Sequence, residues 1–301
     1  MRFPNLPQAL EAALRIQDDN WNESVLHVSD LSAPEEGCPR ELWLRLKGAD
    51  KRMASVGRMW RFRVAKEIHK DLTTLLKVGL PREWEIEGVE VPMSFDGIVG
   101  SADLLLRNTS NHSYIVVDYK SARGQSFHYQ TYEFAKRSHE IQVQGYIYGL
   151  VFPIGAVVLY ADREGDNGFR QTEPVNPDNE TIQRLTEEIK AIRDNKKQPP
   201  LLEPFVEITE NKGDNSVKLS MPWQCNYCDY RDVSCHGALH SDLRADGIVG
   251  YFDANNEFRN DKKTKGGIVK LSSDEVAEKV IELYNKGSYI LKERKTDEIP
   301  F

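Results

Sequence analysis

The segment IVGSADLLLRNTSNHSYIVVDYK, residues 98–120, decides the fold. Its two apolar runs flank a turn-rich stretch and predict a pair of antiparallel strands. Side chains at i and i+2 of a strand share a face, so Asp118 and Lys120 are expected to project side by side where the second strand ends. We expect Asp103 to oppose Val116 across the hairpin, one same-face step from Asp118.

Two carboxylates as close as Asp103 and Asp118 repel each other, and each raises the pKa of the other unless a divalent cation lies between them. The sequence therefore predicts a hard-cation site at the end of this hairpin. His69 stands beside the apolar stripe of a helix predicted over residues 57–76 and is a candidate third ligand. The alternative is a histidine with a purely structural role.

A helix predicted over residues 137–151 carries the next candidate polar groups. Gln142 and Tyr146 are one turn apart and share a face. The same holds for Gln144 and Tyr148, and only one of the two pairs can face the site. A glutamine placed there would hold the lysine amine or a water molecule, whereas the alternative is an amphipathic helix with exposed amides.

Three of the four cysteines, Cys225, Cys228 and Cys235, stand in the segment PWQCNYCDYRDVSCHG. Four cysteines are too few for a disulfide scaffold in a chain of this size. Cys38, far upstream, would complete a set of four thiolates, which is enough for tetrahedral zinc or an iron-sulfur cluster. The alternatives are zinc held by the three clustered cysteines and His236, or buried thiols without metal.

The chain has 301 residues, a net charge of −7 and 40% hydrophobic residues, which is the profile of a globular protein rather than a low-complexity one. No apolar run is long enough to span a membrane and the first residues lack a secretory pattern, so we expect a cytoplasmic protein without a membrane partner. The stretch from Cys38 to Lys70 nevertheless holds ten Lys or Arg against three acids. This basic segment is either a solvated face or a phosphate-binding surface.

Hydrophobic periodicity predicts helices followed by antiparallel strands, and then helix, strand, strand and helix. This order favours an α/β or α+β core with a mixed sheet. In the helix over 57–76, the repeat Trp60, Val64, Ile68, Leu72, Leu76 predicts a stripe that faces the core. Short helices are also expected over 7–17 and 273–286.

Six motifs follow one another as they do in PD-(D/E)XK nucleases of the RecB type, which this chain resembles: Cys38-Pro39-Arg40, His69, Asp103, Asp118-x-Lys120, Gln142-x3-Tyr146 and the three-cysteine cluster. The cysteines resemble those of the iron-sulfur members, among them the CRISPR-associated RecB-like exonucleases and AddB nuclease domains. The resemblance implies a restriction-endonuclease-like α/β (α+β) core, with a mixed central sheet flanked by helices and an iron-sulfur module. We expect this nuclease domain over residues 1–240 and an extension of unknown role over 241–301.

Carried over residue by residue, the resemblance implies that a catalytic Mg²⁺ or Mn²⁺ is bound by His69, Asp103, Asp118 and the main-chain carbonyl of Tyr119. Lys120 would position or activate the attacking water. Gln142, with Tyr146 in the same motif, would support it. A 4Fe-4S cluster, with zinc as the weaker alternative, would be bound by Cys38, Cys225, Cys228 and Cys235.

The function that this implies is metal-dependent hydrolysis of DNA from single-stranded ends, leaving 5′-phosphate and 3′-hydroxyl groups, in recombination, repair or CRISPR-type processing. The chain has no P-loop motif, so unwinding would require a helicase, and an integrase-type protein is a further expected partner. One alternative is a non-catalytic iron-sulfur subunit that binds DNA. Another is an endonuclease with the same chemistry.

Overall fold

The computed structural model describes residues 22–122, 134–165 and 168–200 without interruption. Shorter described pieces are residues 10, 13–14, 127, 202, 205–211, 214–220, 224–225, 228–235, 248–252 and 258–259. The helix predicted over 273–286 and most of the one predicted over 7–17 lie outside these residues. The chain divides into two compact units, Met1–Gly48 with Met53–Pro199, and Ala49–Arg52 with Pro200–Phe301. The domain boundary predicted near residue 240 stays a prediction.

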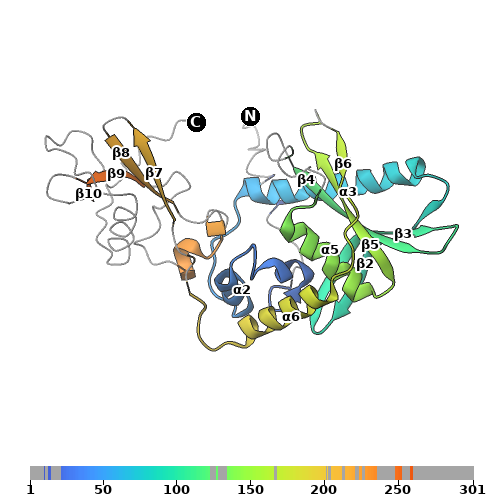
Figure 1. The fold of residues 1–301 in the computed structure, drawn as a ribbon, viewed down its shortest axis with the longest axis horizontal. Coiled ribbons are helices and arrows are strands. Elements are labelled where there is room, and N and C mark those ends of the chain that lie inside the picture. Colours follow the sequence, from blue (N-terminus) through green and yellow to red (C-terminus); the bar gives the residue numbers. More distant parts are fainter. Residues whose placement is uncertain are drawn as a thin grey trace, which may run out of the picture. The chain divides into compact units, whose positions relative to one another are not determined.

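The first unit is built on a mixed sheet in the order β1-β3-β4-β5-β6, with β2 paired to β3 (Figure 1). Strands β3 and β4 are antiparallel, whereas β4 and β5 are parallel and joined by a helical crossover. The predicted mixed sheet is thus confirmed. Its strands are β1 (Leu26–His27), β2 (Trp84–Phe95), β3 (Ile98–Asn108), β4 (Tyr114–Ala122), β5 (Pro153–Asp162) and β6 (Phe169–Gln171).

Helices bury both faces of this sheet, which explains why β4 and β5 are apolar on both sides. On one face, α5 and α6 pack with the 3₁₀ helix η1 onto residues such as Val116 and Val158. On the other face, α3 packs Leu72 against Val117. The helices of this unit are η1 (Val28–Ser32), α2 (Pro39–Leu46), α3 (Val56–Gly79), α5 (Arg137–Leu150) and α6 (Asn179–Asp194).

The predicted register of the β3–β4 hairpin was wrong by two residues. Val116 pairs with Leu105, and not with Asp103, and the ladder ends at Leu104↔Val117. The reason is that β3 continues to Asn108, whose N–H donates to the carbonyl of Ser113 at 2.8 Å and closes a shorter loop. A shift of two keeps every side chain on its face, so the expected proximity of the two carboxylates survives.

The predicted core stripe of α3 holds at one end only. Leu72 is buried and Ile68 packs against the same cluster, but Trp60 is 55% exposed, so its assignment to the core was wrong. On a helix with 3.6 residues per turn, a repeat of four drifts by about 40° at each step. Over the stripe this drift turns Trp60 out of the buried face.

The second unit contains a four-stranded sheet in the order β10-β9-β8-β7. Its strands are β7 (Phe205–Asn211), β8 (Asp214–Ser220), β9 (Ile248–Phe252) and β10 (Phe258–Arg259), and a single π-helical turn, η2 (Arg231–Cys235), lies between β8 and β9. Within the described part of the chain, no helix has the length and apolar character that a membrane crossing requires.

Candidate active site

The site lies where β3 and β4 separate. Beyond the last ladder pair, Asp103 Oδ2 accepts a hydrogen bond from the main-chain N–H of Tyr119 at 2.7 Å. The other carboxylate oxygen, Oδ1, lies 3.4 Å from Nδ1 of His69, which comes from α3. The side chain of Asp103 therefore accepts the hydrogen bond that a main-chain carbonyl of β3 would accept if the strands stayed paired. It also holds His69 beside the point where the strands separate.

An interruption in the face alternation of β3 accompanies this arrangement. Ala102 and Leu105 belong to the core beneath α5, whereas Leu104 belongs to the core beneath α3. Two successive residues, Asp103 and Leu104, thus separate two side chains of one core, although the pairing with β2 stays in register from Val89↔Leu104 to Val91↔Ala102. Opposite this point in β2, Glu90 has a φ of +50°, a left-handed conformation that is uncommon for a residue with a side chain.

Asp118 is the most deeply buried charged group of the site, with 1% of its surface exposed. Burial, reinforced by the charge of Asp103, raises its pKa to about 6, although the ammonium of Lys120 opposes this shift. Lys120 Nζ lies 2.7 Å from Asp118 Oδ2. Beyond this contact with Lys120, the buried Oδ2 has no hydrogen-bond partner among the described residues.

Of the two Gln–Tyr pairs on α5, Gln142 and Tyr146 face the carboxylates. The amide of Gln142 donates to the Tyr146 hydroxyl at 2.6 Å. Burial, with the charges of Asp118 and Asp103, raises the pKa of Tyr146, which stays protonated. Tyr148 instead packs edge-to-face on the ring of Phe95.

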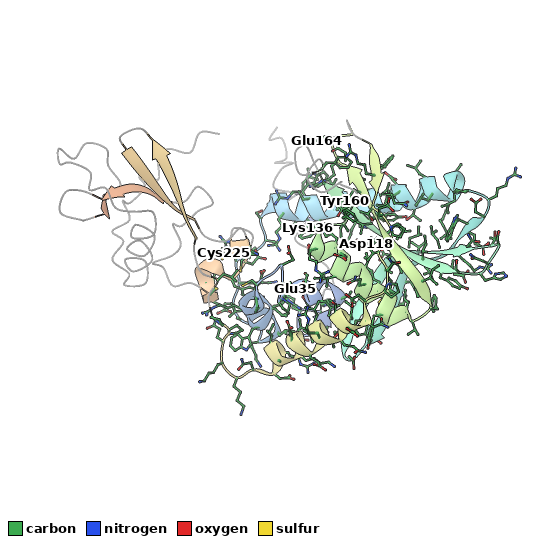
Figure 2. All side chains as sticks on the ribbon, viewed as in Figure 1. Glu35, Asp118, Lys136, Tyr160, Glu164 and Cys225 are labelled. Atoms are coloured by element: carbon green, nitrogen blue, oxygen red, sulfur yellow. The ribbon has the colours of Figure 1, made fainter. Side chains whose placement is uncertain are left out.

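The sequence analysis missed one group near the site, Tyr160 on β5, which Figure 2 labels together with Asp118 and Lys136. Tyr160 is fully buried and stands in register with Lys120 across the parallel β4–β5 pair. Its hydroxyl lies 2.8 Å from Nδ1 of His139 and accepts the N–H of Lys136 at 3.3 Å. Burial, with the charges of Lys120 and Lys136, lowers the pKa of His139 to about 3, so this imidazole is neutral near pH 7.

The carboxylate pair suits a divalent cation in part. In the portion of the chain that the structure describes, no three His, Cys, Asp or Glu side chains converge closely enough to hold a metal ion. Mg²⁺ in phosphate-processing sites needs only one or two carboxylates, because water and substrate oxygens complete its shell. The buried Oδ2 of Asp118, which has no described hydrogen-bond partner beyond the Lys120 contact, is a suitable ligand atom beside Asp103. His69 lies beside Asp103, and its role as a third ligand stays a prediction.

The cysteines give a different result. Cys225 and Cys228 are buried and Cys235 is partly buried, but the described side chains form no three-ligand group there either. Cys38 caps α2, its sulfur accepting the N–H of Glu41 at 3.4 Å. The four-cysteine site stays a prediction.

The segment Ala49–Arg52 contacts the cysteine-bearing region within the second unit. Arg52 donates through its guanidinium to the carbonyl of Cys228 at 2.8 Å and through its N–H to the carbonyl of Asp229 at 2.9 Å. The hydroxyl of Ser234 donates to the carbonyl of Asp50 at 2.6 Å. A short piece of chain that follows α2 is therefore part of the cysteine-bearing unit.

A sheet that opens between two carboxylates, with a lysine two residues after the second, defines a hydrolytic site of the restriction-endonuclease kind. The family model described as the PD-(D/E)XK nuclease superfamily matches residues 8–236. The chain therefore belongs to this superfamily. No curated protein matches it.

Solved structures resemble the chain at low sequence identity. That of SSO0001 is 17% identical with a TM-score of 0.46, covering 78% of this chain and 98% of its own. LHK-Exo, an alkaline exonuclease from Laribacter hongkongensis solved with dAMP, is 16% identical with a TM-score of 0.42, covering 56% and 86%. A phage-related exonuclease from Haemophilus somnus 129PT is 16% identical with a TM-score of 0.41, covering 56% and 92%.

Proposed function

We propose that this protein is a Mg²⁺- or Mn²⁺-dependent deoxyribonuclease that shortens single-stranded DNA from its ends and leaves 5′-phosphate and 3′-hydroxyl groups. The observation that carries the proposal is the buried Asp118 carboxylate between Asp103 and Lys120, whose Oδ2 has no hydrogen-bond partner among the described residues beyond the Lys120 contact. Membership of a nuclease superfamily supports the reaction class. DNA recombination, repair or CRISPR-type processing are the settings that this activity would serve.

Each residue of the site has a separate role in the proposed reaction, according to its position. Asp118, Asp103 and the carbonyl of Tyr119 would hold the cation, which neutralises phosphate charge and lowers the pKa of a bound water. Lys120, at 2.7 Å from Asp118, would orient the attacking water and the scissile phosphate. Gln142, with its amide bonded to Tyr146, would hold that water from the α5 side.

The four cysteines belong to the proposal as a separate, structural part. We propose that Cys38, Cys225, Cys228 and Cys235 bind a 4Fe-4S cluster, with zinc as the alternative metal. Their spacing is the support for this. The test is the visible spectrum and metal content of anaerobically purified protein: absorbance near 400 nm with iron and sulfide supports the cluster, and stoichiometric zinc without that absorbance rejects it. Cys38→Ala is expected to lose metal and stability together, because a missing thiolate opens the site.

The nuclease is tested with single-stranded DNA labelled at the 5′ or the 3′ end, with and without Mg²⁺ or Mn²⁺. Wild-type protein should shorten one label progressively, and Lys120→Ala should not. Lys190→Ala is the matched control, because Lys190 lies on α6 and pairs with Asp96 at 3.4 Å. If the wild-type protein binds DNA but cleaves neither label, the chain is a non-catalytic DNA-binding subunit instead. Internal cuts that appear first would identify an endonuclease.

A further inference from the structure

Helix α3 is covered in part along its whole length: Met59 near its start is buried, whereas Leu75 and Val78 near its end are exposed. In the C-terminal half, Leu72 and Thr73 are buried, and the Thr73 hydroxyl lies 3.4 Å from that of Tyr119 on β4. In the N-terminal half, Phe62 is 58% exposed. A large aromatic side chain left open to solvent within a basic helix is a common feature of surfaces that bind single-stranded nucleic acid.

Phe62 lies on the face of α3 that leads to the site. Arg58, Phe62, Lys66 and His69 follow at spacings of four, four and three, which places them in one row along the helix. His69 at the end of this row contacts Asp103. With a rise of 1.5 Å per residue, Phe62 and His69 are separated by about 10 Å along the helix axis. This separation is within the reach of a few nucleotides of an extended strand.

The charges along this row suit a polyanion. Arg58 lies over the ring of Phe62, with its Cζ 5.7 Å from the ring centroid, and Lys66 is exposed one turn further on. No acidic residue belongs to the row Arg58, Phe62, Lys66, His69. A guanidinium against one side of an aromatic ring leaves the other side for a base and is itself near the adjoining phosphate.

The opposite row of α3 has a different character, although it also carries an exposed aromatic residue. Trp60 is followed at spacings of seven and four by Glu67 and Asp71. Glu67 is itself paired with Lys70 at 2.8 Å. Exposure of an aromatic ring is therefore common to both rows, and the Trp60 row has cations beside it in Arg63 and Lys70. A row without acidic residues that ends at His69 is found on the Phe62 side. Trp60 is a matched internal control.

We propose that Phe62 is a stacking platform for an unpaired base of single-stranded DNA, with Arg58 and Lys66 contacting the flanking phosphates, so that the strand runs along α3 toward His69 and Asp118. The proposal rests on the nuclease function proposed above, which it deepens by naming how the substrate is gripped. It assigns the preference for single strands to Phe62, because a base within a duplex has both faces covered by its neighbours.

The test measures binding of a fluorescein-labelled thymidine oligonucleotide by anisotropy in EDTA, where metal-dependent cleavage cannot occur. Phe62→Ala should weaken binding about tenfold, within the 1–3 kcal/mol range of base stacking on an aromatic side chain. Phe62→Trp should retain wild-type affinity, and Trp60→Ala should change it less than twofold. An oligonucleotide with abasic sites should bind the wild-type protein as weakly as Phe62→Ala binds the intact one.

Equal losses in Phe62→Ala and Trp60→Ala, or no loss in Phe62→Ala, would overturn the proposal. Far-ultraviolet circular dichroism and the melting temperature confirm that each variant is folded; because Phe62 is exposed, both should stay at wild-type values. The outcome is separable from that of the nuclease test. A wild-type protein that cleaves DNA while Phe62→Ala binds normally refutes the platform alone, whereas Phe62-dependent binding without cleavage refutes the nuclease alone.

Discussion

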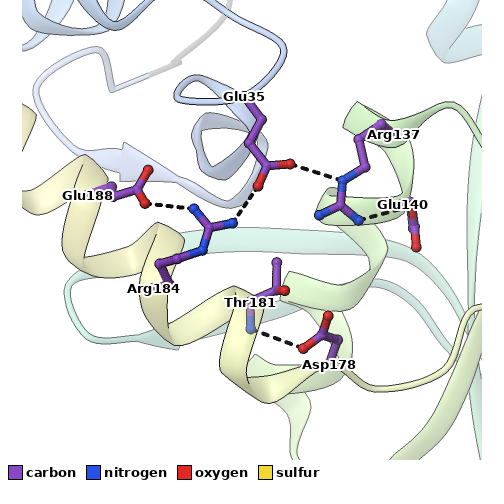
Figure 3. A network of polar contacts seen from close by, with 7 residues as sticks. All are labelled: Glu35, Arg137, Glu140, Asp178, Thr181, Arg184 and Glu188. Atoms are coloured by element: carbon purple, nitrogen blue, oxygen red, sulfur yellow. Dashed lines mark hydrogen bonds and ion pairs between the residues drawn. The ribbon is translucent and has the colours of Figure 1, made fainter.

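Two charged clusters in the first unit, one around Glu35 and one around Asp118, differ in how deeply their carboxylates are buried and how they are paired. Around Glu35, the carboxylate bonds with Arg137 at 3.0 Å and also with Arg184, so both of its oxygens are paired at the protein surface (Figure 3). Asp118 is buried, close to a second carboxylate, and the described contact of its Oδ2 is the one with Lys120. The first cluster joins the segment before α2 to α5 and α6. In the second, the free-energy cost of burying the Asp118 carboxylate is offset only in part by its contacts.

The comparison separates charges that stabilise the fold from charges that serve chemistry. Partial burial disfavours ionised Glu35, but hydrogen bonds from Arg184 and Arg137 outweigh it and lower its pKa. For Asp118 burial dominates and raises the pKa to about 6. Ionisation of a carboxylate buried in this way is unfavourable. Such a group beside Lys120 is expected at a functional site, where a cation or substrate binds to it.

The largest expected effect is a loss of cleavage on substitution of Asp118, which distinguishes its cluster from the one around Glu35. Asp118→Asn should lower metal-dependent cleavage by about 10²-fold or more. The substitution removes a charged ligand of the proposed cation, and that cation would stabilise the negative charge that develops on the phosphate. The free energy of unfolding should fall by no more than about 1 kcal/mol: the variant leaves the partly exposed Lys120 without its carboxylate, but it also removes a buried charge whose raised pKa shows that ionisation of Asp118 costs the fold stability. Single-turnover cleavage and urea denaturation measure the two quantities. A large loss of stability with normal cleavage would reverse the assignment.

A second prediction concerns acid stability near Lys120. The pKa of His139 is about 3 in the folded chain, below its ordinary value of 6.5. Its contribution to stability is therefore complete above pH 6.5 and is lost as the pH falls toward 3. At pH 5 the loss amounts to about 2 kcal/mol.

His139→Asn should remove most of this pH dependence, because an amide can bond the Tyr160 hydroxyl without titrating. The measurement is chemical denaturation of both proteins between pH 7 and pH 5. His112, an exposed histidine in the hairpin loop, provides the control variant His112→Asn, which should follow the wild-type curve. Parallel curves for His139→Asn and wild type would show that His139 is not a buried neutral group.

Third, the two tyrosines of α5 should behave differently. Tyr146→Phe removes the hydroxyl that receives the Gln142 amide and should reduce cleavage about tenfold, because the amide is no longer held toward the carboxylates. Tyr148→Phe removes a hydroxyl that lies 3.5 Å from Gln183 and should leave cleavage unchanged. Comparing kcat for the two variants tests this. Equal effects would mean that the Gln142–Tyr146 pair does not serve the site.

The smallest expected effect belongs to the surface cluster. Glu35→Gln should lower stability by about 1 kcal/mol at pH 7, the upper range for exposed ion pairs, with normal cleavage. Because the folded pKa of Glu35 lies below its ordinary value of 4.5, this contribution is present above that pH and disappears as the pH falls below it. Denaturation at pH 7 and pH 4 measures the difference, which high salt should also reduce. A cleavage defect in this variant would show that the two clusters are coupled.

Much of this site was predictable from local pattern. Asp103, Asp118 and Lys120 lie on two strands joined by a short loop, so hairpin geometry alone brings them together, and a register error of two residues did not separate them. The Gln142–Tyr146 pair followed from helical spacing. Each of these inferences needed only contacts between neighbouring elements.

The remainder depended on contacts that the sequence does not encode locally. Tyr160 stands in register with Lys120 because β5 pairs in parallel with β4, and nothing in either strand specifies that register. The exposure of Trp60 depends on which face of α3 packs against the sheet, because a repeat of four drifts away from that face along the helix. The cysteines illustrate the same limit, because Cys38 and Cys225 are far apart in the sequence and only their spacing pattern linked them.

The most direct test of the central claim is a Mn²⁺ titration followed by electron paramagnetic resonance, run beside cleavage of single-stranded DNA on the same samples. Wild-type protein should bind Mn²⁺ over the concentration range in which it begins to cleave. Asp118→Asn should lose both signals, and Asp194→Asn, which removes an exposed carboxylate paired with Arg193 at 2.8 Å, should lose neither. Unchanged Mn²⁺ binding and cleavage in Asp118→Asn would contradict the account.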